Sequence, residues 1–188
     1  MVGIPFRNIT HHHCRIIMID YFPLCEVKDF QDLDMTKYAF TVELSVKEYD
    51  SGDPLAFKMD GHRFDGALRT LKWSTDQTYS VKIVTKPATE VTRINVNGND
   101  LEVAKEKIGT FSGTWNTAGS EISKRGTRFP LIFLVNFAPE GQMRAEFQSK
   151  VYSKNDSHAV WGHKMNSVEF KCSGDDDGFV KIVDESYK

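Results

Sequence analysis

The chain has 188 residues, of which 40% are hydrophobic and 27% charged, and its formal net charge at pH 7 is −2. This length suits one domain and is marginal for two. A body of about 150 residues buries roughly 70% of the surface that its unfolded chain exposes, so a core can form without disulfides. The slightly acidic balance argues against nucleic-acid binding through a broad basic face, and no apolar run reaches the roughly 18–20 residues that span a membrane.

The first 38 residues show no sustained hydrophobic period and differ in pattern from the rest. We expect a poorly ordered N-terminal extension over residues 1–38, followed by a single domain over 39–188. The most apolar stretch of the extension, RIIMIDYFPLC, is short and carries Asp20 and Pro23, so it matches neither a signal peptide nor an anchor. Three cysteines without a cysteine-rich framework favour a reducing compartment.

The body of the chain is a series of short alternating segments, beginning with Ala39–Tyr49. Side chains on a strand alternate between its two faces, so this pattern predicts one buried and one solvated face. Further strands are predicted at Leu68–Trp73, Thr78–Lys86, Ile108–Trp115, Phe129–Phe137, Gln142–Tyr152, Ser167–Cys172 and Phe179–Val183. With the hairpins below, about nine or ten strands predict an all-β fold, an antiparallel sandwich or flattened barrel. A helical turn is expected around Ser157–Met165.

Two turn dipeptides predict hairpins with a defined register. Asn-Gly tolerates positive φ at both residues, so Asn97-Gly98 predicts a type I′ turn that sets Ile94 opposite Leu101. By the same geometry, Asp60-Gly61 predicts a hairpin with Phe57 opposite Phe64.

One predicted strand, Phe129–Phe137, breaks the alternation because FPLIFLVNF is apolar on both faces. We therefore expect its second face to be covered as well, and two explanations stay open. Either this strand is central and is capped by the extension or by a loop, or one of its faces lines an apolar pocket. Such a pocket would hold a ligand, a lipid or a partner segment. The candidate lining residues of such a pocket are Tyr79, Ile83, Phe111, Phe133 and Phe147.

Two histidine-containing segments are candidates for metal or catalytic sites. His11-His12-His13-Cys14 offers imidazole and thiolate donors, but adjacent residues rarely converge on one metal, so a solvated tail is the better interpretation. His158 and His163 flank Trp161-Gly162 without HExxH spacing. We expect a tryptophan that packs on the end of the barrel between exposed histidines.

The remaining candidates for chemistry are also weak. Asp175-Asp176-Asp177-Gly178 lacks the spacing of an EF-hand and predicts an acidic turn. Cys172 alternates with Phe170 and Val168, which predicts a small core residue rather than a nucleophile. The chain contains no P-loop, GxGxxG or GxSxG motif. We therefore predict a non-enzymatic protein with no catalytic residues, no metal and no cofactor.

Several segments occur in a fixed order from about Lys37 to the end. They are FKMDGHRF at 57–64, RTLKW at 69–73, TYSVKIVTKPAT at 78–89, GTFSGTW at 109–115, WGHKMNSVEFKC at 161–172 and VKIVDESYK at 180–188. By their order and spacing, these residues resemble the cannabinoid receptor-interacting protein 1 family. The resemblance implies an immunoglobulin-like sandwich similar to the Rho GDP-dissociation inhibitor, and it supplies no catalytic residues.

The same resemblance implies a cytoplasmic adaptor that lies at the plasma membrane through its receptor. Its partner would be the C-terminal tail of the type 1 cannabinoid receptor or of another G-protein-coupled receptor, whose signalling it modulates. A G-protein α subunit and a lipidated protein are the further partners considered, and nucleic acid is not one. The tail would add a strand to a sheet edge or place apolar side chains in the barrel mouth.

The alternative is a lipid chaperone that holds an acyl or prenyl group of a partner protein in an apolar cavity. The doubly apolar strand motivates it, because each buried methylene contributes about 0.8 kcal/mol. Ordinary core packing uses the same residues, so the volume of the interior separates the two hypotheses.

Overall fold

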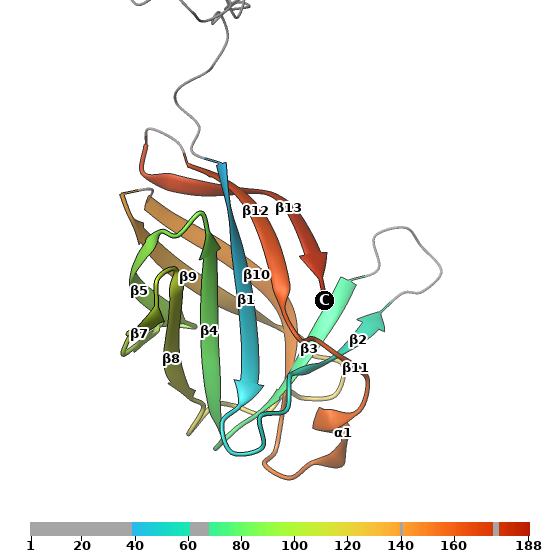
Figure 1. Cartoon of the computed structure of the whole chain (residues 1–188). Coiled ribbons are helices and arrows are strands. Elements are labelled where there is room, and N and C mark those ends of the chain that lie inside the picture. Colours follow the sequence, from blue (N-terminus) through green and yellow to red (C-terminus); the bar gives the residue numbers. More distant parts are fainter. Residues whose placement is uncertain (1–38, 61–67, 140, 175–176) are drawn as a thin grey trace, which may run out of the picture. The chain divides into compact units, whose positions relative to one another are not determined.

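The structure is a computed structural model, and it describes residues 39–60, 68–139, 141–174 and 177–188. These residues form thirteen strands and one four-residue helix (Figure 1), which confirms the all-β prediction. The predicted extension, with His11–Cys14, lies outside the described residues, as do Asp175 and Asp176 of the acidic turn. The division into an extension and one domain stays a prediction.

The strands lie close to the segments that alternate in sequence. Their bounds are β1 Ala39–Glu48, β2 Ala56–Asp60, β3 Leu68–Ser74, β4 Thr78–Lys86, β5 Glu90–Val96, β6 Asn99–Leu101, β7 Ala104–Lys107, β8 Thr110–Asn116, β9 Phe129–Ala138, β10 Gly141–Tyr152, β11 His163–Lys164, β12 Val168–Gly174 and β13 Phe179–Tyr187. The helix α1 spans Ser157–Val160, inside the predicted helical turn. The count exceeds the expected nine or ten because β6, β7 and β11 have only two to four residues each.

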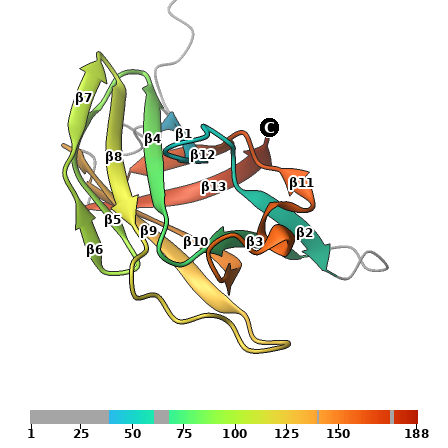
Figure 2. The same cartoon turned by 90° about the horizontal axis from the view of Figure 1, so that it is seen from below.

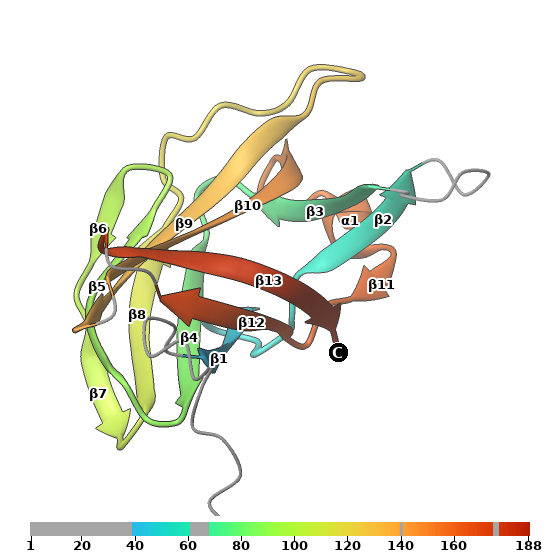
Figure 3. The same ribbon diagram turned by 90° about the horizontal axis from the view of Figure 1, so that it is seen from above.

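The strands join into one curled sheet with the order β11-β2-β3-β10-β13-β12-β1-β4-β8-β7, while β9 and β5 continue from β10 on a branch that ends at β6. Most pairs are antiparallel, as predicted, but β10 pairs in parallel with both β3 and β13. These parallel neighbours make the sheet mixed. Figures 2 and 3 show how the sheet bends, so that the half with β1 and β4 faces the half with β9 and β10.

The core lies between the two halves and consists mainly of the apolar side of each alternating strand. Along β1, Phe40, Val42, Leu44 and Val46 are buried, with at most 5% of their surface exposed. Aromatic rings connect the halves: Phe40 of β1 lies edge-on to Phe137 of β9, with ring centroids 5.3 Å apart. Such pairs add about 0.5–1.5 kcal/mol beyond the area that they bury.

One predicted hairpin is confirmed and the other is wrong. Asn97 and Gly98 both have positive φ, and Ile94 lies opposite Leu101. The strand partner of Phe57, by contrast, is Leu71 of β3, so the register predicted for the Asp60-Gly61 hairpin is wrong. The Asp-Gly signal is misleading because β2 pairs instead with β3, the alternating segment that follows residues 61–67. Those residues, Phe64 among them, lie outside the described part.

The doubly apolar strand β9 is central, with β5 on one side and β10 on the other. Its inner face is buried, whereas Ile132 and Leu134 on the outer face are only half-buried. Across the pairing with β10, these two residues lie opposite Glu146 and Arg144, which form an ion pair. The second face is therefore bordered by charged side chains. It is not fully covered, contrary to the expectation from the sequence.

Candidate functional site

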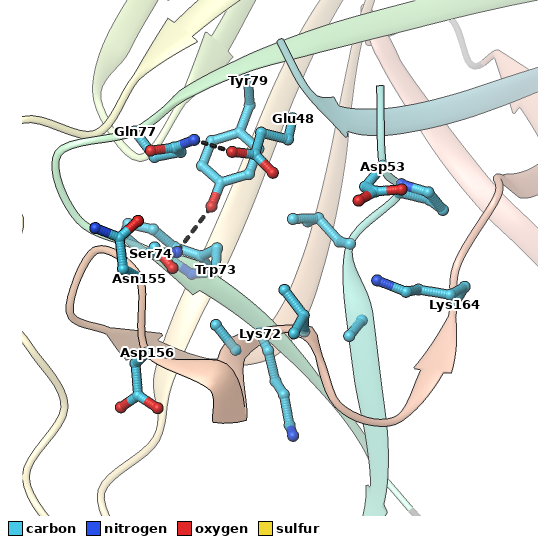
Figure 4. Close-up of a pocket in the computed structure, with 15 residues that line it drawn as sticks. Glu48, Asp53, Lys72, Trp73, Ser74, Gln77, Tyr79, Asn155, Asp156 and Lys164 are labelled. Atoms are coloured by element: carbon cyan, nitrogen blue, oxygen red, sulfur yellow. Dashed lines mark hydrogen bonds between the residues drawn. The ribbon is translucent and has the colours of Figure 1, made fainter. Parts of the chain in front are cut away.

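A hollow of about 170 Å³ opens at the end of the fold that carries α1 (Figure 4), and we call it the end pocket. Its walls come from the β1–β2 connection, the end of β3, the start of β4 and the segment around α1. The lining residues are Glu48, Asp53, Pro54, Leu55, Ala56, Lys72, Trp73, Ser74, Gln77, Tyr79, Asn155, Asp156, Ala159, Val160 and Lys164.

Two local turns bring the walls of the end pocket together. After β1 the chain reverses through Gly52, whose φ of +74° favours glycine and whose amide donates to the Glu48 carbonyl at 2.9 Å. On the other side, Asp156 is the N-cap of α1, and its carboxylate accepts a hydrogen bond from the His158 amide at 2.9 Å. That hydrogen bond lowers the pKa of Asp156, so the cap stays ionised at neutral pH.

Two buried aromatic side chains form the floor of the pocket, and the hydroxyl of one of them, Tyr79, has a hydrogen-bond partner. Trp73 and Tyr79 are about 5% exposed or less, and the Tyr79 hydroxyl accepts a hydrogen bond from the Ser74 amide at 2.8 Å. Burial raises the pKa of Tyr79, the largest of several influences on it. Because the hydroxyl is neutral and already bonded, it is suited to shaping the floor and not to transferring a proton.

Among the charged groups of the rim, Lys72 is fixed by hydrogen bonds and two others are open. Lys72 donates to the carbonyl oxygens of His158 and Trp161, at 2.9 and 2.6 Å, so it ties α1 to β3. Within the described part of the chain, the Lys164 ammonium and the Asp53 carboxylate have no hydrogen-bond or ion-pair partner. Figure 4 shows both groups beside the hollow, where they can meet charges on a ligand.

The five residues proposed to line an apolar cavity all lie in the core instead. Tyr79, Ile83, Phe111, Phe133 and Phe147 are each at most 5% exposed and belong to one cluster of buried side chains. Phe133 and Phe147 meet edge to face, with ring centroids 5.8 Å apart, and Ile83 pairs with Phe111 across β4 and β8. Only Tyr79 of the five reaches the end pocket.

The other candidate residues divide between surface and core. His158 and His163 are exposed, as predicted, but Trp161 is 60% exposed, so it does not pack on the end of the fold as expected. The only ring contact seen for Trp161 in the described part is with His158, at 4.9 Å between ring centroids. Cys172 is a buried core residue as predicted, and burial raises the pKa of its thiol to about 12.

The described side chains bear on metal binding and on the kind of ligand that the end pocket suits. Among the described residues, no three His, Cys, Asp or Glu side chains converge on a point that could hold a metal ion. The end pocket combines an apolar floor with a few charged groups, an arrangement typical of sites that bind a ligand by shape and charge. Sequence reasoning missed the pocket because its residues come from separate segments, and none of them carries a local motif.

Comparison with known proteins identifies the family. The model of the family described as CB1 cannabinoid receptor-interacting protein 1 matches residues 36–187. The chain belongs to this family. The human protein named CB1 cannabinoid receptor-interacting protein 1 is 31% identical over 140 residues, which make up 70% of this chain and 84% of the human protein. The bovine and mouse proteins of that name match with the same identity and coverage.

Membership in the CB1 cannabinoid receptor-interacting protein 1 family confirms the resemblance seen in the sequence. The family is named for an interaction with a receptor and is not a known enzyme family. Its matched region contains every described strand and all residues of the end pocket. In the part of the chain that the structure describes, no helix has the length and apolar character needed to cross a bilayer.

Proposed function

We propose that this chain is a non-enzymatic adaptor that binds the cytoplasmic C-terminal tail of the CB1 cannabinoid receptor, or of another G-protein-coupled receptor, and modulates its signalling. The observation that carries the proposal is the family match across residues 36–187. The adaptor would work in the cytoplasm, at the plasma membrane through its receptor. By occupying the tail, it would compete with a G-protein α subunit for the same segment.

Strand addition is the less favourable of the two binding modes. The exposed edge strand β7 pairs only with β8 among the described strands, and all four of its residues are exposed. It is short, carries Lys105, Glu106 and Lys107, and its ladder is interrupted by a register shift between Lys105 and Lys107. Charge and a bulge are devices that keep sheet edges from pairing with other chains, so we do not place the tail at β7.

The end pocket fits the second mode, in which a side chain of the tail enters the mouth of the sandwich. Its volume is about 170 Å³, and an engineered apolar cavity of about 150 Å³ holds benzene. One leucine- or phenylalanine-sized side chain is therefore accommodated over Trp73 and Tyr79. Residues of the tail on either side would then meet the open charges of Lys164 and Asp53.

A pocket-filling substitution tests this mode. Ala159 lines the end pocket and is 8% exposed, so Ala159→Leu places three more carbons in the hollow. We expect the affinity for a fluorescent receptor-tail peptide to fall by roughly ten-fold or more, because a buried anchor loses its pocket. The matched control is Ala104→Leu on exposed β7, which should leave the affinity unchanged.

Two results would count against the proposal. Absence of saturable binding by the unmodified chain would contradict the adaptor function itself. Saturable binding that survives Ala159→Leu but is lost in Ala104→Leu would move the tail to the β7 edge. Because Ala159→Leu can perturb α1, the exposed Lys164→Glu variant is measured in parallel, and we expect it to weaken binding as well.

No specific observation favours the lipid-chaperone alternative. The residues assigned to its cavity fill the core with aromatic contacts, so a lipid would have to displace them. Native mass spectrometry of the purified chain is expected to give the mass of the protein alone. A bound acyl or prenyl chain would reverse this preference, and a lipidated partner would then replace the receptor tail.

A further inference from the structure

A basic and apolar surface lies beside the end pocket, on the other side of Asp156. We call it the α1 surface and define it by Ile122, Lys124, Arg125, Lys150, Lys154 and Trp161. A second hollow, of about 310 Å³, is lined by residues that include Ile122, Lys150, Asp156 and His158. The ring of His158 contacts Trp161, so the apolar members of the surface are connected through this hollow.

The fold holds the two segments of the α1 surface together. The β8–β9 connection is attached to the end of β10, because Ser123 donates its amide to the Val151 carbonyl at 3.0 Å and its hydroxyl accepts from the Val151 amide at 2.9 Å. Figure 1 shows this connection and α1 at the same end of the strands. The β8–β9 connection and the end of β10 are thus held side by side.

The apolar side chains of the α1 surface are unusually open to solvent. Trp161 is 60% exposed and Ile122 is 52% exposed, while neighbouring Val160 is 52% exposed. Lys72 holds the backbone at Trp161, so the indole is presented on an anchored segment. Tryptophan with an apolar body and a polar ring nitrogen is enriched where proteins meet the interface of a bilayer.

The charge of this surface is opposite to that of the whole chain. The net charge of the chain is −2, yet four of the six defining residues are basic and Lys164 is nearby. The carboxylates in the same segments are Glu121 and Asp156, and Asp156 is bound to His158. The neighbouring β1–β2 connection carries Asp50 and Asp53, so an anionic plane would attract the α1 surface and repel the adjacent corner.

We propose that the α1 surface docks directly on an anionic lipid bilayer, with Trp161 and Ile122 at the headgroup level and the four basic side chains toward the lipid charges. This goes beyond the proposed receptor function, because it needs no protein partner. Each basic residue near an anionic surface contributes about 1 kcal/mol, which is roughly five-fold in affinity. A few such residues and one interfacial tryptophan support weak, reversible and salt-sensitive binding.

Sedimentation of the full chain with vesicles tests the proposal. The probes are neutral phosphatidylcholine vesicles and vesicles in which part of the lipid is phosphatidylserine. We expect binding only to the second kind, weaker at high salt. Lys124→Glu with Arg125→Glu should weaken it by roughly ten-fold or more, because two positive charges become negative, which changes the charge of the surface by four units. Trp161→Ser should weaken it several-fold.

The matched control is Lys86→Glu with Lys107→Glu, which changes the net charge equally at the far end of β4. It should retain more vesicle binding than the Lys124/Arg125 variant, and circular dichroism should confirm that all variants are folded. Equal loss in both charge variants, equal binding to neutral vesicles, or no binding at all would overturn the proposal. So would a Trp161→Ser variant that binds vesicles normally but loses the receptor-tail peptide, since the surface would then be a peptide site. The affinity for the receptor-tail peptide is measured in the same variants. If it does not depend on these substitutions, the test of vesicle binding is separate from the test of the receptor function.

Discussion

The core and the end that carries α1 use the same kinds of residue in opposite ways. In the core, Trp115 is 1% exposed and its ring lies 4.9 Å from that of Trp73. At the α1 end, Trp161 is 60% exposed, and charged groups of Lys164 and Asp53 stand open beside a hollow. The core therefore accounts for stability, while the α1 end has the side chains that remain available for a partner.

The largest expected effect is a contrast between two tryptophans. Trp115→Ala leaves a cavity beside Trp73 and Tyr79 and should lower the free energy of unfolding by about 3–5 kcal/mol. Trp161→Ala removes a side chain that is mostly in water and should change it by no more than about 0.5 kcal/mol. Urea unfolding curves of both variants check this. Similar losses in the two would show that the α1 end is part of the cooperative core.

The second prediction concerns the attachment of the α1 segment to β2. Gly162 has a φ of +128°, and a Cβ there would lie 2.4 Å from the Phe57 carbonyl oxygen. Gly162→Ala should therefore cost about 2–3 kcal/mol, through backbone strain and a clash that moves β11 away from β2. The control, Gly52→Ala, also has positive φ but open space around the added atom, and should cost only about 1 kcal/mol. Thermal unfolding of the two variants separates strain from the clash.

A smaller and more local effect is expected at Lys72. Lys72→Met removes the donor to the carbonyl oxygens of His158 and Trp161. The half-buried charge keeps part of its contact with water, so the loss should be about 1 kcal/mol. Hydrogen exchange of the α1 segment should accelerate while that of β4 is unchanged. Lys154→Met is the control, and equal acceleration in it would remove the role given to Lys72.

The fourth prediction concerns the Cys172 thiol, whose ionisation affects the stability of the fold only at high pH. Burial raises the pKa of the Cys172 thiol from 9.0 to about 12. Below pH 9 the thiol is protonated in both the folded and the unfolded state, so the stability that comes from the raised pKa of the buried thiol is fully present. Between pH 9 and about 12 the unfolded state loses this proton first, which favours unfolding. The stability of the unmodified chain should thus fall more steeply over this range than that of Cys172→Ala, and parallel curves would contradict the burial of a neutral thiol.

Local patterns in the sequence predicted the core well because burial alternates along a strand whatever its partner. Phe40 to Val46 of β1, the Asn97-Gly98 turn and the core position of Cys172 all depend on residues close in sequence. The pairing of strands is a different matter, since it depends on residues far apart. Phe57 could not be assigned to Leu71, nor β10 to its parallel neighbours, from local signals alone.

The end pocket could not be predicted for the same reason. Lys72 and Ala159 become neighbours only after β3 and α1 meet, and neither is unusual in its own segment. The sequence predicts that Trp161 packs on the end of the fold, in line with the high average burial of tryptophan, whereas in the structure it is exposed. Its exposure is a property of the folded surface at the α1 end.

The most direct test of this account is a two-dimensional amide spectrum of the isotope-labelled chain, titrated with the receptor C-terminal tail peptide. We expect saturable shifts that concentrate on the walls of the end pocket, such as Leu55, Ser74 and Ala159, and that leave β7 and the centre of the core unchanged. Shifts confined to β7, shifts spread through the core around Phe133, or no saturable shifts would contradict it.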